Sequence, residues 1–227
     1  MIRFESSEEG FGGLARRALG ANLGREVRAE PTVRAFVALP LPSALRRSVG
    51  EIARRLSEQP ASRSSNARFI GDDALHVTLK FLGRVESSRL PAIREALSVA
   101  ARLQPRLRLE LKGAGCFPDA ARPRVLWLGL EGDLPALASL AAEVEKQLLP
   151  LGFPPEDHAF SPHLTLCRLA SPTGASDLAA ALFALAGEIH GELPAEELVL
   201  FRSDTLPTGA RHSPIYRIPF GGGRLLA

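Results

Sequence analysis

Two short segments of this 227-residue sequence share one pattern, a histidine and a threonine separated by one apolar residue and followed by leucine. The segments are His-Val-Thr-Leu at 76–79 and His-Leu-Thr-Leu at 163–166. Successive side chains of a strand point to opposite faces, so each histidine shares a face with its threonine while the apolar residues face a core. Two such strands around one cleft would bring two imidazoles and two hydroxyls together.

Two facing histidines are suited to acid–base chemistry on phosphorus. With a reference pKa of about 6.5, one imidazole can take a proton from water while the other, protonated, gives one to a leaving oxygen. Threonine hydroxyls can donate to phosphate oxygens, and a strained cyclic phosphodiester needs no metal. The alternatives are structural histidines, or a metal site. The metal site is disfavoured because neither histidine has a neighbouring carboxylate or a recognised ligand spacing. We expect no cofactor.

The elements around the two motifs follow one order twice. Apolar runs and alternation predict strands, and periodic apolar stripes predict helices. The strands are expected at 33–39, 67–70, 74–82, 106–113, 124–130, 163–169, 196–202 and 213–220, and the helices at 43–58, 86–103, 134–149 and 176–186. Because the motifs stand at the same point of each half, we interpret the chain as a duplicated half. Lobes are expected at 33–117 and 124–220, with a flexible extension at 1–32 and a tail at 221–227.

Composition limits the class of protein. Hydrophobic residues make up 45% of the chain, as in ordinary globular proteins. No apolar run is long enough to cross a membrane, and residues 1–32 do not resemble a secretory signal. Two cysteines are too few for a disulfide framework. We therefore expect a cytoplasmic monomer without membrane contact. A net charge of +3 is compatible with a polyanionic partner but does not require one.

The residues around both motifs resemble a known family. They include RAFVALPLP in the first strand, DDALHVTLKFLG around the first motif, RPRVLWLGL, LGFPPEDHAFSPHLTLCR around the second motif, and ELVLFRS. From 33 to 220 the sequence resembles the RNA 2′,3′-cyclic phosphodiesterases, also called 2′-5′ RNA ligases, of the two-histidine phosphoesterase superfamily. The resemblance implies an α+β fold of two pseudo-symmetric lobes, each an antiparallel sheet with flanking helices, around a central cleft.

The resemblance also implies an activity. RNA ending in a 2′,3′-cyclic phosphate would be hydrolysed to a 2′-phosphate, with His163 as general base on water and His76 as general acid on the 3′-oxygen. Thr78 and Thr165 would bind the phosphate, and weak, reversible 2′-5′ ligation would occur at the same site. Two other functions stay open: a phosphodiesterase for small cyclic nucleotides or ADP-ribose cyclic phosphate, and a module that binds nucleotide without chemistry.

Further contacts to the ligand follow from the same resemblance. Arg168 matches a phosphate-contacting arginine, although its odd offset from His163 places it on the opposite face of a regular strand; a structural salt bridge is the alternative. Phe36 and Phe160 match aromatic positions near the ligand, with core packing as the alternative.

Two basic residues near the motifs complete the candidate site. Lys80 follows His76 and Thr78 on the same face by count, so it is expected at the cleft mouth or as a solvated edge lysine. His212 stands where some relatives carry tyrosine, and is expected to donate to phosphate or to lie on the surface. His158 and His190 are expected outside the site.

Overall fold

The structure, a computed structural model, describes residues 30–187, 189–206 and 209–221. Most of the predicted extension and tail lies outside the described residues. The strands are β1 (Thr32–Pro40), β2 (Ala67–Phe69), β3 (His76–Glu86), β4 (Leu107–Phe117), β5 (Val125–Gly132), β6 (Leu164–Leu169), β7 (Ile189–Ala195), β8 (Glu197–Leu206) and β9 (Gly209–Pro219). The α-helices are α1 (Ser43–Ser57), α2 (Pro60–Ser64), α3 (Leu90–Ala101), α4 (Leu134–Leu148) and α5 (Ala175–Phe183).

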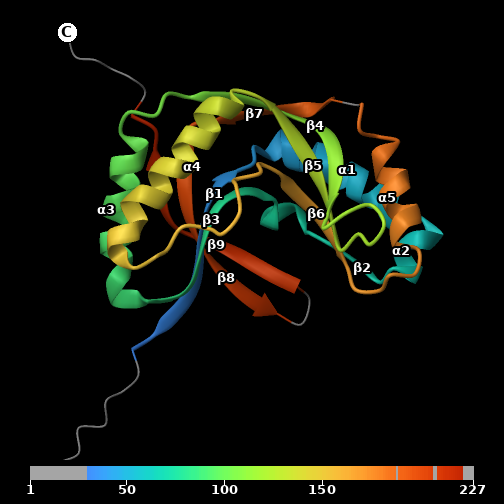
Figure 1. The fold of residues 1–227 in the computed structure, drawn as a ribbon, viewed down its shortest axis with the longest axis horizontal. Helices are drawn as coiled ribbons and strands as arrows, with labels where there is room; N and C mark the ends of the chain where they lie inside the picture. The colour runs from blue at the N-terminus through green and yellow to red at the C-terminus, as the bar shows by residue number, and fades with distance from the viewer. Residues whose placement is uncertain (1–29, 188, 207–208, 222–227) are drawn as a thin grey trace, which may run out of the picture.

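The strands form one sheet, in the spatial order β7-β4-β5-β6-β3-β1-β8-β9, with β2 paired with β6 (Figure 1). Every pairing found in the described part of the chain is antiparallel. The predicted α+β class with antiparallel pairing is therefore confirmed. The sheet falls into two groups that meet at β3 and β6, where the register pairs only Val77 with Leu164.

These two groups of strands differ from the lobes expected at 33–117 and 124–220. Strand β4, the last of the first segment, lies beside β5 of the second, and β8 of the second lies beside β1 of the first. The first half of the sequence thus gives β2 and β4 to the group of β5 and β6, and the second half gives β8 and β9 to the group of β1 and β3. The reason is that strand pairing depends on contacts between distant segments, which the order of elements along the chain does not specify.

The helices cover the face of the sheet opposite the two motifs. Helices α3 and α4 pack on each other on one side, with α3 against β8 and β9, while α1, α2 and α5 gather on the other (Figure 1). Apolar side chains of the strands and helices form one large buried cluster there. No helix in the described ranges is long and apolar enough to cross a bilayer.

Most predicted elements are present within a few residues of their expected bounds, and two were missed. Strand β7 was not predicted because Gly191 and Pro194 weaken the sequence pattern of a strand. The proline is tolerated because β7 lies at one edge of the sheet. Helix α2 is too short for a periodic stripe. Strand β3 also runs on to Glu86, so α3 begins later than expected.

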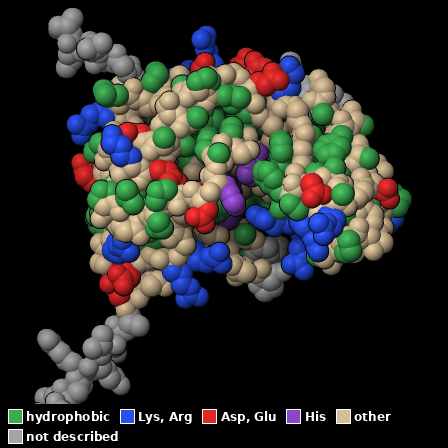
Figure 2. All heavy atoms as spheres, in the orientation of Figure 1, with side chains coloured by type: hydrophobic (Ala, Val, Ile, Leu, Met, Phe, Trp, Pro, Cys, Tyr) green, Lys and Arg blue, Asp and Glu red, His purple; other side chains and the backbone are tan. Residues whose placement is uncertain are grey.

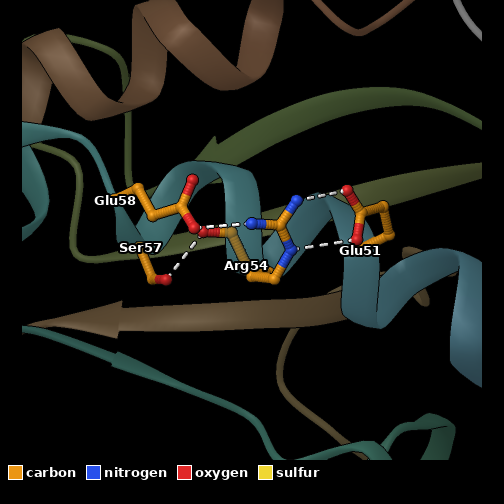
Figure 3. Close-up of polar contacts among 4 residues, drawn as sticks. All are labelled: Glu51, Arg54, Ser57 and Glu58. Carbon is orange, nitrogen blue, oxygen red and sulfur yellow. Dashed lines mark hydrogen bonds and ion pairs between the residues drawn. The ribbon is translucent and has the colours of Figure 1, made fainter.

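Helix α1 shows why the amphipathic pattern was easily recognised. Its buried residues are Leu45, Val49, Ile52 and Leu56. On its exposed face Arg54 bonds to Glu51 and Glu58, at three and four residues' distance (Figure 3). Such solvated pairs stabilise a helix by only a few tenths of a kcal/mol each, about 0.2–0.5, so packing of the apolar stripe holds α1 in place.

Candidate active site

The two histidine–threonine motifs lie in one cleft of about 460 Å³ on the face of the sheet opposite the helices. Its walls include His76, Thr78, His163, Thr165, Arg168 and His212. Figure 2 shows histidine side chains at the bottom of a hollow, with basic side chains beside it. The four motif residues come together because the ends of β3 and β6, the two strands at the centre of the sheet, lie side by side.

Both motif histidines are oriented in the same way. Nδ1 of His76 lies 2.7 Å from the carbonyl oxygen of Ala74, and Nδ1 of His163 lies 2.8 Å from that of Ser161, in each case two residues earlier. A carbonyl oxygen only accepts, so each Nδ1 carries the hydrogen and donates it. In the neutral form each Nε2 therefore has a free lone pair, which suits proton exchange with a ligand.

The surroundings of His76 are more enclosed. Burial lowers its pKa to about 4, and the hydrogen bond to Ala74 opposes this only in part; His212, His163 and Arg168 lower the pKa further through like charge. Burial also lowers the pKa of His212. In the ligand-free protein His76 is consequently neutral at neutral pH.

A β-bulge follows the threonine in both motif strands. In β3, Thr78 pairs with Ala38 while Lys80 pairs with Val37, so Leu79 is the extra residue. In β6, Thr165 and Cys167 pair with adjacent residues of β5, so Leu166 is the extra residue. An extra residue reverses the alternation beyond it.

The bulge in β6 places Arg168 in the cleft despite its odd offset from His163. In the described part of the chain Arg168 forms no ion pair, which favours the ligand-contacting interpretation over a structural salt bridge. Its cross-strand neighbour on β2 is Arg68, which shares its face. The corresponding bulge in β3 brings Phe81 into the cleft, where the residue is 60% exposed.

The same bulge makes both expectations for Lys80 wrong. Lys80 lies on the core face, only 2% exposed. Its ammonium group donates to Glu145 of α4 at 2.9 Å and to the carbonyl oxygen of Pro154 at 2.7 Å. Counting by twos from His76 failed because the alternation reverses after Thr78.

Aromatic rings enclose His76. Phe36 lies on β1 with its ring centroid 4.6 Å from that of His76, and it stacks on Phe201 of β8. Phe36 is only 3% exposed and is also part of the cleft wall. The two interpretations of this residue, core packing and a position near the ligand, therefore both apply. His212 of β9 meets the His76 ring edge-on at 5.1 Å. His212 therefore lies beside the motif rather than apart from it on the surface.

A different pair of rings, which sequence patterns did not identify, surrounds His163. The ring of Phe117 meets that of His163 edge-on, with 5.0 Å between the ring centroids, and the centroid of Trp127 lies 6.0 Å from that of His163. The centroids of Phe117 and Trp127 are 5.3 Å apart. Trp127 sits opposite Thr165 and Gly115 in the sheet. The glycine makes room for the indole, because a β-carbon there would lie 2.1 Å from the ring. The alternation of side chains along β5 is the sequence signal that could have placed Trp127 on the cleft face.

The remaining predicted contact, Phe160, falls outside the cleft. Phe160 is half-buried against the main core and is not among the residues that line the cleft, which agrees with its core-packing alternative. His158 is exposed, and the side chain of His190 lies outside what the structure describes. In the described ranges, no three His, Cys, Asp or Glu side chains gather as metal ligands.

Solved structures match this arrangement. A protein from Thermus thermophilus aligns with a TM-score of 0.67 and 26% identity, over 83% of this chain and 98% of that one. LigT of E. coli, solved in complex with 3′-AMP, aligns with a TM-score of 0.62 and 29% identity, over 84% and 99%. The fold and paired motifs define a phosphoesterase of the two-histidine class.

Sequence comparisons identify the family. The model of the 2′-5′ RNA ligase superfamily matches residues 41–206. RNA 2′,3′-cyclic phosphodiesterases of Methanothermobacter thermautotrophicus and Archaeoglobus fulgidus are 32% and 33% identical, over 81% and 82% of this chain and 95% and 97% of their own lengths. The chain belongs to the 2′-5′ RNA ligase superfamily. The prediction of an enzyme of this cyclic phosphodiesterase family is confirmed.

Proposed function

We propose that this protein opens the 2′,3′-cyclic phosphate at the end of an RNA to give a 2′-phosphate. The observation that carries the proposal is the matched pair of imidazoles in one cleft, each fixed by a carbonyl two residues earlier and each beside a threonine. Relatives matching over nearly their whole length are named RNA 2′,3′-cyclic phosphodiesterases, which supports RNA as the substrate.

In the proposed reaction, Nε2 of His163 takes a proton from a water molecule as its oxygen bonds to phosphorus. The bond from phosphorus to the 3′-oxygen breaks, and Nε2 of His76 gives its proton to that oxygen. The hydroxyls of Thr78 and Thr165 and the guanidinium of Arg168 hold the non-bridging oxygens. The 2′-oxygen stays on phosphorus, so the product is a 2′-phosphate. General acid–base catalysis contributes roughly 100- to 10,000-fold per group.

The lowered pKa of His76 bears on its role. A neutral imidazole suits a base, whereas an acid must carry a proton. A bound phosphodiester anion favours the imidazolium form and raises the pKa again. The assignment of His76 as acid therefore requires its pKa to rise on binding. An NMR titration of the histidine rings, without and with a nucleoside 2′-phosphate, measures this directly; an unchanged midpoint for His76 would assign the base role to it instead.

The proposed reaction uses no metal, because the two imidazoles and the ring strain of the substrate supply what it needs. Ligation at the same cleft is the same exchange with a 5′-hydroxyl in place of water, and we expect it to be weak because water is far more concentrated.

The experiment is a product assay with EDTA present. A short RNA ending in 2′,3′-cyclic phosphate is incubated with the protein, and the product is identified by mass and by its response to phosphatase. We expect a 2′-phosphate end. We expect His76→Ala and His163→Ala each to lower the rate at least about 100-fold without changing the circular dichroism spectrum. His158→Ala is the matched control, because that histidine is exposed outside the cleft.

Other results would redirect the proposal. Full activity in either cleft variant would overturn the mechanism, and loss of activity with EDTA that zinc restores would point to a metal site. A protein that opens small cyclic nucleotides but not RNA would belong to the alternative class of small-molecule phosphodiesterases. Binding without turnover would indicate a nucleotide-binding module.

A further inference from the structure

Two arginines stand directly opposite each other on neighbouring strands, near the end of the cleft that lies farthest along β3. Arg34 of β1 and Arg84 of β3 are register partners, and both are exposed. Their neighbours Val33, Ala35 and Val85 pack into the core, so both arginines lie on the cleft face. Arg34 is also part of the cleft wall.

A second irregularity in β3 puts Arg84 on this face. The register passes from the pair Phe36–Phe81 to the pair Ala35–Gly83, which leaves Leu82 as an extra residue. Gly83 has a φ of +70°, a left-handed conformation that glycine adopts readily. Simple alternation from Phe81 would have placed Arg84 in the core.

Neither arginine of the pair has an ion-pair partner among the residues that the structure describes. Like charges directly opposite each other destabilise an antiparallel pair, by roughly 0.2–1 kcal/mol. The ion pairs found in the described part of the chain involve other arginines and lysines. Glu86 lies two residues beyond Arg84 on the same face, but neither arginine forms an ion pair with it. Two guanidinium groups on adjacent strands therefore remain available for an anion, and guanidinium groups bind phosphate well.

We propose that Arg34 and Arg84 form a separate phosphate subsite, which binds a backbone phosphate of the RNA several nucleotides from its reacting end. The inference rests on the proposed function. If His76 protonates the 3′-oxygen, the ribose lies against β3, and the RNA chain continues from it along β3 towards Arg84. The register pairs Val77 with Leu39 and Arg84 with Arg34, five residues apart on β1, a span of about 17 Å in a strand. A single nucleotide cannot cover that span, so the subsite selects oligonucleotides over mononucleotides.

The test compares two substrates and two double variants. The substrates are a nucleoside 2′,3′-cyclic monophosphate and an RNA of about ten nucleotides ending in the same cyclic nucleotide, assayed over a series of salt concentrations. R34Q/R84Q removes the subsite. R47Q/R55Q removes the same charge from exposed positions on α1, on the helical side of the sheet.

We expect the wild-type protein to prefer the oligonucleotide. R34Q/R84Q should lower kcat/KM for the oligonucleotide about tenfold more than for the mononucleotide, mainly through KM, a loss of one order of magnitude in binding. The slope of log kcat/KM against log salt for the oligonucleotide should become shallower by about 0.7 for each phosphate that the variant no longer binds. R47Q/R55Q should keep the wild-type preference.

Three results would overturn the inference while leaving the proposed function intact. They are equal activity of the wild-type protein on both substrates, an equal loss on both in R34Q/R84Q, and the same effect in R47Q/R55Q. A wild-type protein that opens neither substrate would instead overturn the proposed function, and the subsite with it.

Discussion

At the scale of single residues, the burial of His76 couples its protonation to the stability of the fold. Its ring packs against Phe36 and His212, and burial lowers its pKa to about 4, against 6.5 for an unperturbed histidine. Between these two pH values the unfolded chain binds the proton more readily than the folded protein. Folding therefore weakens as pH falls through this window, while above it His76 is neutral in both states and has no effect.

We expect the contribution of His76 to lower the free energy of unfolding by at most about 3 kcal/mol between pH 7 and pH 4. Urea unfolding at both pH values, in the wild-type protein and His76→Ala, measures it. The variant should lose less stability on acidification than the wild-type protein. The same acid sensitivity in both proteins would show that His76 is not the titrating group responsible.

At the scale of elements, the buried ion pair of Lys80 with Glu145 connects β3 to α4. Lys80 also holds the carbonyl of Pro154, and Glu145 accepts from the backbone of Glu156, in the segment that leads to His163. We expect Lys80→Ala to lower the free energy of unfolding by about 3 kcal/mol, because it leaves a partly buried carboxylate unpaired. Lys112→Ala, which breaks an exposed pair with Glu131, should cost less than about 1 kcal/mol. Equal losses in urea unfolding would contradict the structural role given to Lys80.

The contact between β4 and β5 beside His163 gives a second test at this scale. Gly115→Ala would push a methyl group into the ring of Trp127, so the indole must move from its place beside His163. We expect a loss of stability of about 1–3 kcal/mol and lower turnover. Since Trp127 is the only tryptophan, its fluorescence should shift to longer wavelength.

Gly71→Ala is the control for that substitution, because a β-carbon at Gly71 would meet no atom within 4 Å. Unchanged fluorescence in Gly115→Ala would mean that the indole does not depend on this glycine.

At the scale of the whole molecule, the reciprocal exchange of β4 and β8 makes the two halves of the chain interdependent. A fragment of residues 30–119 would contain β4 without β5, and one of residues 120–221 would contain β8 without β1. We expect neither fragment to unfold cooperatively alone, because each exposes the apolar edge that the other covers. Mixing them should restore a cooperative transition and activity. Cooperative unfolding of either fragment alone, followed by circular dichroism, would contradict this interdependence.

The sequence alone was sufficient to locate the two histidine–threonine motifs and most elements. The repeated histidine–threonine spacing, the alternation around it and the periodic stripe of α1 are local patterns, and local backbone geometry follows from them. The family resemblance added the fold class, which the structure and the comparisons support. The roles of the two histidines remain predictions.

The tertiary structure decided which side chains reach the cleft. The bulge after Thr78 places Phe81 instead of Lys80 on the cleft face, and the bulge after Thr165 places Arg168 there. The bulge before Arg84 turns that residue to the same face. The exchange of β4 and β8, and the position of His212 beside His76, likewise arise from pairings between distant segments. These features depend on register, and a shift of one residue in register reverses every face beyond it without altering the local pattern of the sequence.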